Sequence, residues 1–219
     1  MSIRQDTRTS EVRPATAPSI ADPGPLGLAG FALTTFLLSA SNAGWMGSAT
    51  GAAWLGYAFA YGGLGQLLAG MWEFKNKNVF GATAFSTYGA FWIGLGLWDL
   101  LVASKPAAGV SAATWTVQTG HDQGWILLAF AIFNTYMLLM STQVNLAVFS
   151  VFLTLEVTEI LLFIGAFQGN TSIIKGGGIV GVITAVVAWY TSAAGVSNGI
   201  PGSAIRLPVG KPLFSGSIG

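Results

Sequence analysis

The chain has 219 residues, of which 53% are hydrophobic and only 8% are charged. Soluble domains usually carry about 25% charged residues, so this composition excludes an ordinary water-soluble fold and predicts a polytopic membrane protein. The net charge of +1 gives no argument for nucleic-acid binding, and a chain without cysteine has no disulfide, thiolate nucleophile or cysteine metal site.

The expected elements, in chain order, begin with a polar stretch over residues 1–21 that has no periodicity and predicts a disordered tail. Six apolar segments follow, each long enough to cross about 30 Å of hydrocarbon as a helix. They are residues 25–44, 51–72, 82–103, 123–142, 145–168 and 173–194. We therefore expect an all-α integral membrane protein with a six-helix transmembrane domain over 22–195 and a flexible tail over 196–219.

The first span should begin sharply. Asp22 is a good N-cap because its carboxylate can accept from free backbone N–H groups, and Pro23 suits the first helical position, where no N–H is needed. In the last span, Gly177, Gly181 and Ala185 are spaced four apart, which favours close helix packing and offers a stripe for contact between subunits.

Basic residues predict the orientation, because Lys and Arg stay on the cytoplasmic side. With six spans, one side has seven of them and the other has two. The seven are Arg4, Arg8, Arg13, Lys75, Lys77, Arg206 and Lys211, and the two are Lys105 and Lys175. Both termini should therefore be cytoplasmic, in a plasma or inner membrane.

Three linked motifs carry a family resemblance. Residues 22–31 read Asp-Pro-Gly-Pro-Leu-Gly-Leu-Ala-Gly-Phe, residues 59–66 read Phe-Ala-Tyr-Gly-Gly-Leu-Gly-Gln, and residues 78–92 begin Asn-Val-Phe-Gly and include Thr-Tyr-Gly. These stretches, with Gly-Met-Trp-Glu-Phe-Lys at 70–75, resemble the acetate uptake transporter family, also called succinate–acetate permeases. One position departs, since the family's opening Asn is Asp22 here.

The resemblance implies six helices around a pore in each subunit, subunits assembled as hexamers, and passage of acetate and related small carboxylates such as succinate. It describes that passage as channel-like or proton-coupled. It also implies an apolar constriction, whose three residues fall on Phe31, Tyr88 and Leu155. An apolar ring of this kind would block hydrated ions by dewetting.

Further candidates for pore lining or substrate binding come from the opening motif and from polar positions in the spans. They are Asp22, Leu26, Gly27, Thr34, Thr87, Glu156 and Glu159. Hydroxyl groups can donate hydrogen bonds to a carboxylate, whereas an ionised Asp22 would repel it.

The fifth span carries two glutamates where the family has Thr-like or apolar residues. A charge at mid-bilayer costs at least about 2.5 kcal/mol, so such groups usually face a cavity or a partner. Helical geometry places Glu156 and Glu159 on one arc with Phe152 and Leu155. We expect at least one to be protonated at neutral pH, so that carboxylate passage depends on pH. The alternative is a structural role, in which both bond Thr residues or Asn134 on a neighbouring helix.

The sequence has no phosphate-binding loop, catalytic triad or dinucleotide fingerprint, so we expect no enzyme, no cofactor and no metal site. Two other functions stay open. Acidic residues in a pore would favour a cation or ammonium pathway, and buried carboxylates could serve a membrane enzyme or sensor.

Overall fold

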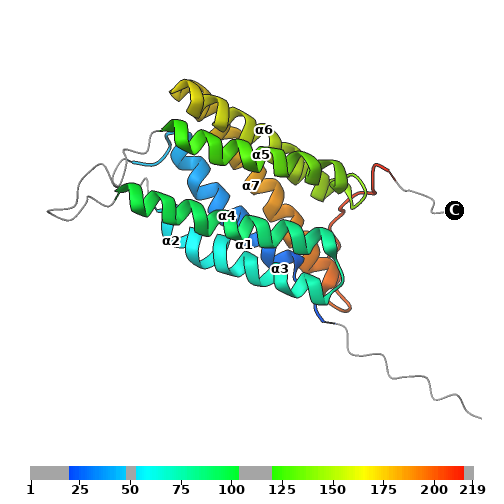
Figure 1. Cartoon of the computed structure of the whole chain (residues 1–219). Coiled ribbons are helices and arrows are strands. Elements are labelled where there is room, and N and C mark those ends of the chain that lie inside the picture. Colours follow the sequence, from blue (N-terminus) through cyan, green and yellow to red (C-terminus); the bar gives the residue numbers. More distant parts are fainter. Residues whose placement is uncertain (1–19, 48–52, 104–119, 215–219) are drawn as a thin grey trace, which may run out of the picture.

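The computed structural model of the chain describes residues 20–47, 53–103 and 120–214, and the secondary structure in these ranges is entirely helical. In Figure 1 the helices lie side by side as a bundle. The elements are α1 (Gly24–Asn42), α2 (Trp54–Phe59), η2 (Ala60–Gly65), α3 (Gln66–Lys75), α4 (Val79–Ala103), α5 (Gly120–Ser141), α6 (Leu146–Gln168) and α7 (Thr171–Gly199). The expected amino-terminal tail lies, up to residue 19, outside the described residues.

Four of the described helices, α1, α5, α6 and α7, are long and apolar enough to cross a membrane. The expected all-α class is therefore confirmed, and the helices indicate a membrane protein. The expected second span, 51–72, corresponds to three consecutive elements, because α2, η2 and α3 follow one another from Trp54 to Lys75. α4 occupies the place of the third expected span.

The π-helical element η2 forms where glycines let two segments approach closely. A Cβ at Gly30 of α1 would lie 2.6 Å from the carbonyl oxygen of Tyr61, and a Cβ at Gly62 would collide with the side chain of Thr34. Any larger residue at Gly30 or Gly62 would push α1 away from η2. A π-helical turn inside a helix often marks a functional site, which draws attention to this region.

The small residues of α7 pack inside the chain. A Cβ at Gly177 would lie 2.8 Å from Leu162 of α6, a Cβ at Gly181 would meet Ser39 of α1, and Ala185 is fully buried. The expectation that this stripe serves contact between subunits is therefore wrong, because α1 and α6 already cover it.

The ends of the helical region differ slightly from the sequence prediction. α1 begins at Gly24, so Pro23 stands at the N-cap rather than at the first helical position. Asp22 still satisfies a free donor, since its Oδ1 accepts from the backbone N–H of Gly24 at 2.9 Å. At the other end, α7 continues to Gly199, beyond the expected boundary at residue 195.

The segment after α7 returns along the bundle. The backbone N–H of Ala147 donates to the carbonyl of Val209 at 2.9 Å, and that of Leu213 donates to the carbonyl of Thr142 at 2.8 Å. The Tyr190 hydroxyl donates to the carbonyl of Pro208 at 2.6 Å. The first and last described residues thus lie at the same end of the bundle (Figure 1).

Candidate functional site

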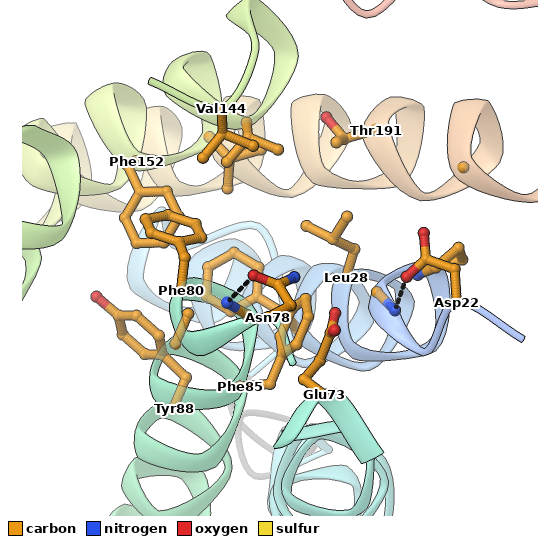
Figure 2. A pocket seen from close by; sticks show the side chains of 18 of the residues that line it. Asp22, Leu28, Glu73, Asn78, Phe80, Phe85, Tyr88, Val144, Phe152 and Thr191 are labelled. Carbon is orange, nitrogen blue, oxygen red and sulfur yellow. Dashed lines mark hydrogen bonds between the residues drawn. The ribbon is translucent and has the colours of Figure 1, made fainter. Parts of the chain in front are cut away.

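A cavity of about 210 Å³ enters the bundle at the end where the described chain begins and ends. Its lining comes from α1, α3, α4, α6 and α7 and from the segment that follows α7. Residues at helix ends and connections surround its mouth, namely Asp22, Glu73, Asn78, Val144, Asn145 and Val209. Figure 2 shows the carboxyl groups of Asp22, in the segment before α1, and Glu73, on α3, facing this space.

Backbone and side-chain contacts hold the Glu73 carboxyl group at the mouth. Glu73 is 1% exposed, and the Asn76 Nδ2 donates to its Oε2 at 3.2 Å. A Cβ at Gly81, in the first turn of α4, would lie 2.7 Å from the Glu73 Oε1, so glycine there leaves the room that the carboxyl group occupies. Asn78 caps the same turn, since its Oδ1 accepts from the Gly81 N–H at 3.1 Å. With Asp22 nearby, the mouth carries two acidic side chains.

Gln66 is a lining residue that our sequence reasoning did not single out. It begins α3, directly after η2, and is 1% exposed. Its Oε1 has no hydrogen-bond partner among the described residues, although the side chain borders the cavity. A polar residue at mid-span beside a glycine-rich turn is the signal that could have identified it, because buried amides normally find partners.

The three residues expected to form the constriction line this cavity from three different helices. Phe31 from α1, Tyr88 from α4 and Leu155 from α6 all line it, and they are 4%, 3% and 6% exposed. The rings of Phe31 and Tyr88 meet edge to face with centroids 5.7 Å apart. The fold thus brings together side chains from three separate helices. We call these three residues the barrier.

A second cavity, of about 580 Å³, lies between α4 and α5. Thr87, Phe91 and Phe130 are among its lining residues. The Tyr88 ring lies 6.3 Å from Phe91 and 6.1 Å from Phe130. Tyr88 therefore borders the first cavity and contacts aromatic side chains that line the second.

The other candidate residues of α1 are Leu26, Gly27 and Thr34, and they line neither of these two cavities. Leu26 is 48% exposed on the outer side of α1. Gly27 packs against the Phe85 ring, and a Cβ at this position would lie 2.6 Å from that ring. Thr34 is fully buried, and its hydroxyl donates to the Gly30 carbonyl at 3.0 Å, so it packs α1 against η2.

The two glutamates of α6 lie behind the barrier and line neither of these cavities. Glu156 accepts from the Asn134 Nδ2 and from the Thr135 hydroxyl, both at 2.7 Å. This is the structural alternative that the sequence left open for it. Glu159 is 4% exposed, and its Oε1 lies 3.4 Å from the Tyr88 hydroxyl. Glu159 thus touches a barrier residue directly.

The chain is similar to known proteins in sequence and in structure. The model of the GPR1/FUN34/yaaH family matches residues 5–209. A solved structure of the bacterial acetate channel SatP is similar with a TM-score of 0.77 and 34% identity, covering 87% of this chain and 99% of that one.

Two similar proteins are named for the transport of different molecules. The succinate-acetate/proton symporter SatP of Escherichia coli K12 is 34% identical over 192 residues, which are 88% of this chain and 96% of the relative. Ammonia transport outward protein 2 of Saccharomyces cerevisiae is 38% identical over 187 residues, which are 84% of this chain. The chain spans less than two thirds of the length of that fungal relative, 64%.

Proposed function

The chain belongs to the GPR1/FUN34/yaaH family, and on this premise we propose that it moves acetate and related small carboxylates such as succinate across a membrane. The passage is channel-like or proton-coupled. The similarity to a bacterial acetate channel and to a succinate-acetate/proton symporter supports this substrate class.

One observation carries the proposal, namely a cavity that enters from one end of the bundle and is lined by the buried barrier of Phe31, Tyr88 and Leu155. Apolar rings of this kind hold back hydrated ions until they widen. The second cavity, whose aromatic lining Tyr88 contacts, supplies the space that a permeating molecule would reach after crossing the barrier.

The membrane arrangement is part of the same proposal. We count six spans, with α2, η2 and α3 together as the second, and we place both termini in the cytoplasm of a cell with the chain in its plasma or inner membrane. The common location of the two ends supports an even number of spans (Figure 1). The excess of Lys and Arg on that side supports the orientation. Assembly as a homohexamer rests on the family resemblance alone.

A second candidate function is a pathway for ammonia or ammonium. Two observations favour it, the name of the yeast relative and the acidic mouth formed by Asp22 and Glu73. Carboxylates at a pore entrance attract cations and repel carboxylate substrates.

The test is uptake into liposomes that contain the purified chain. We expect labelled acetate to enter faster than into protein-free liposomes at two opposite pH gradients, and a Leu155→Trp variant, which fills the barrier, to be slow. Transport of methylammonium without transport of acetate would favour the second candidate. Acetate flux equal to that of protein-free liposomes would contradict the first.

A further inference from the structure

The hydroxyl of the barrier residue Tyr88 is held from behind by two polar side chains. It lies 2.9 Å from the Oδ1 of Asn134 on α5 and 3.4 Å from the Oε1 of Glu159 on α6. Asn134 is fully buried and Glu159 is 4% exposed, so these groups depend on one another for hydrogen bonds.

A backbone carbonyl group fixes the orientation of the Asn134 side-chain amide. Its Nδ2 lies 3.0 Å from the carbonyl oxygen of Phe152 and 2.7 Å from the Oε2 of Glu156. A carbonyl oxygen can only accept, so the amide nitrogen must face it. Turning the amide over would set two oxygens against each other. The Asn134 Oδ1 therefore faces Tyr88 as an acceptor.

The single hydrogen of the Tyr88 hydroxyl is then assigned. It goes to the Asn134 Oδ1, which is the nearer acceptor. The hydroxyl oxygen keeps lone pairs but has no second hydrogen to offer to Glu159. An ionised Glu159 would place another pure acceptor beside it, whereas a protonated Glu159 would donate to the hydroxyl oxygen and complete the bond.

We propose that Glu159 carries a proton and donates it to the Tyr88 hydroxyl, and that it is the positioning residue through which protonation controls the barrier. This inference rests on the proposed function, since it concerns how the barrier conducts. Glu159 lines neither cavity described above and acts through Tyr88.

Glu156 makes the contrast within the same helix. Its two carboxyl oxygens face the Asn134 amide and the Thr135 hydroxyl, both at 2.7 Å. The single Thr135 hydrogen goes to this nearer acceptor rather than to the Ala131 carbonyl at 2.9 Å, so the two donors can satisfy an ionised carboxylate. The second oxygen of Glu159, Oε2, is buried and has no hydrogen-bond partner in the part of the chain that the structure describes. The proton of the pair therefore belongs on Glu159.

The other titratable groups of the surrounding helices lie at a distance or are already named. On α4 the group facing Glu159 is Tyr88, and Asp99 lies about three turns further along. On α5, Tyr136 is 48% exposed and its ring packs against Phe133, while His121 and Asp122 stand in the first turn. On α7, Lys175 lies beside Gly44 and Tyr190 bonds Pro208. The helix α1 has no titratable side chain.

Loss of the Glu159 proton changes the barrier in two ways. Tyr88 must turn its hydrogen toward the new carboxylate, which breaks its bond to Asn134, and a negative charge arises directly behind the ring. Both effects oppose the passage of a carboxylate anion. Flux should therefore be high while Glu159 is protonated and fall as the pH rises through its titration.

Infrared spectroscopy of the reconstituted chain tests the protonation without relying on transport. The carbonyl stretch of a protonated carboxyl group should be present in the wild type at neutral pH, absent in Glu159→Gln and present in the matched control Glu156→Gln. Its absence from the wild type, or its loss in Glu156→Gln alone, would overturn the assignment.

Acetate flux measured against pH tests the control of the barrier. We expect wild-type flux to fall about tenfold on the alkaline side, the scale of one like charge in a partly buried site. Glu159→Gln stays neutral and can still donate to Tyr88, so its flux should not fall. Glu156→Gln should retain the fall. A Glu159→Gln variant that keeps the wild-type profile would overturn this inference, whereas no flux in the wild type would contradict the proposed function instead.

Discussion

One buried glutamate lies at the mouth of the cavity and another lies behind the barrier, and their hydrogen-bond partners differ. At the mouth, Glu73 accepts from Asn76 at the end of a helix, with Asp22 exposed beside the same space. Behind the barrier, the described residues offer Glu159 the Tyr88 hydroxyl as a partner for its Oε1 and no partner for its Oε2. The mouth thus offers its glutamate a side-chain amide donor, whereas the described contact of Glu159 is with a hydroxyl that also bonds Asn134.

This difference follows from what each region can offer. Helix ends and connections supply free donors and water, as at Asn76 and Asn78. The middle of a helix has already used its backbone donors, so a buried side chain there depends on other side chains. Glutamate can therefore have two roles in this proposal. Glu73 contributes to the electrostatic field at the entrance, and the protonation of Glu159 controls the position of Tyr88 in the barrier.

The largest effect on stability should come from Asn134→Leu. It removes hydrogen bonds to Tyr88, Glu156 and the Phe152 carbonyl at once, which should lower the free energy of unfolding by about 2 kcal/mol. Denaturant unfolding in detergent micelles measures the change. The matched control at the mouth is Asn76→Ala, which removes one hydrogen bond at an exposed position and should cost about 0.5 kcal/mol or less. Equal losses in the two variants would erase the distinction between the regions.

The largest effect on flux should come from Phe31→Ala. Removing this ring widens the barrier and weakens dewetting, so acetate flux should rise about tenfold and larger carboxylates should pass. Leu28→Ala is the control, because Leu28 lines the same cavity nearer its mouth (Figure 2). Liposome uptake of a series of carboxylates of increasing size measures both variants. An unchanged size limit in Phe31→Ala would remove Phe31 from the barrier.

A smaller effect is expected at the mouth from Asp22→Asn, which restores the residue typical of the family. Loss of one exposed negative charge should raise acetate flux about twofold at low salt, because the entrance repels the anion less. The difference should disappear at about 1 M salt, where the Debye length is only about 3 Å. A gain that persists at high salt would point to a direct contact of Asp22 with the substrate rather than to its charge.

The smallest effect should follow from Leu26→Ala. The sequence motif suggested this residue for the pore, whereas the structure places it on the outer side of α1 at 48% exposure. Flux and its pH profile should match those of the wild type in the same uptake assay. A clear change in the size limit would mean that Leu26 does reach the pathway.

Several features of the fold could be predicted because they depend on local composition. Runs of apolar residues locate helices, so the expected spans fall on the observed helices to within a few residues, apart from the last, where α7 extends to Gly199. The π-helical turn η2 could not be predicted in this way, because it depends on how closely Gly62 approaches Thr34 on another helix.

Some residues of the candidate site could likewise be suggested from the sequence, and others could be found only in the structure. The family resemblance suggested Phe31, Tyr88 and Leu155 for one constriction, and the structure shows all three lining one cavity. Helical periodicity placed Glu159 and Leu155 on one arc of α6 but could not identify the side chains opposite. Gln66 and Glu73 stand in the quoted motifs but were not proposed as lining residues, since the motifs alone do not show which polar side chains face a cavity.

By itself, then, the sequence determined the class of protein, the approximate positions of the helices and the resemblance from which the barrier was suggested. These properties follow from hydrophobicity and from motifs that are contiguous along the chain. Only the tertiary structure decided that the glycine stripe of α7 packs against α1 and α6, that Leu26 lies on the outer face, and that Asn134 and Glu159 meet at the Tyr88 hydroxyl. The physical reason is that a hydrogen bond or a close contact joins residues on different helices, and the rotation and spacing of those helices arise from packing across the whole bundle.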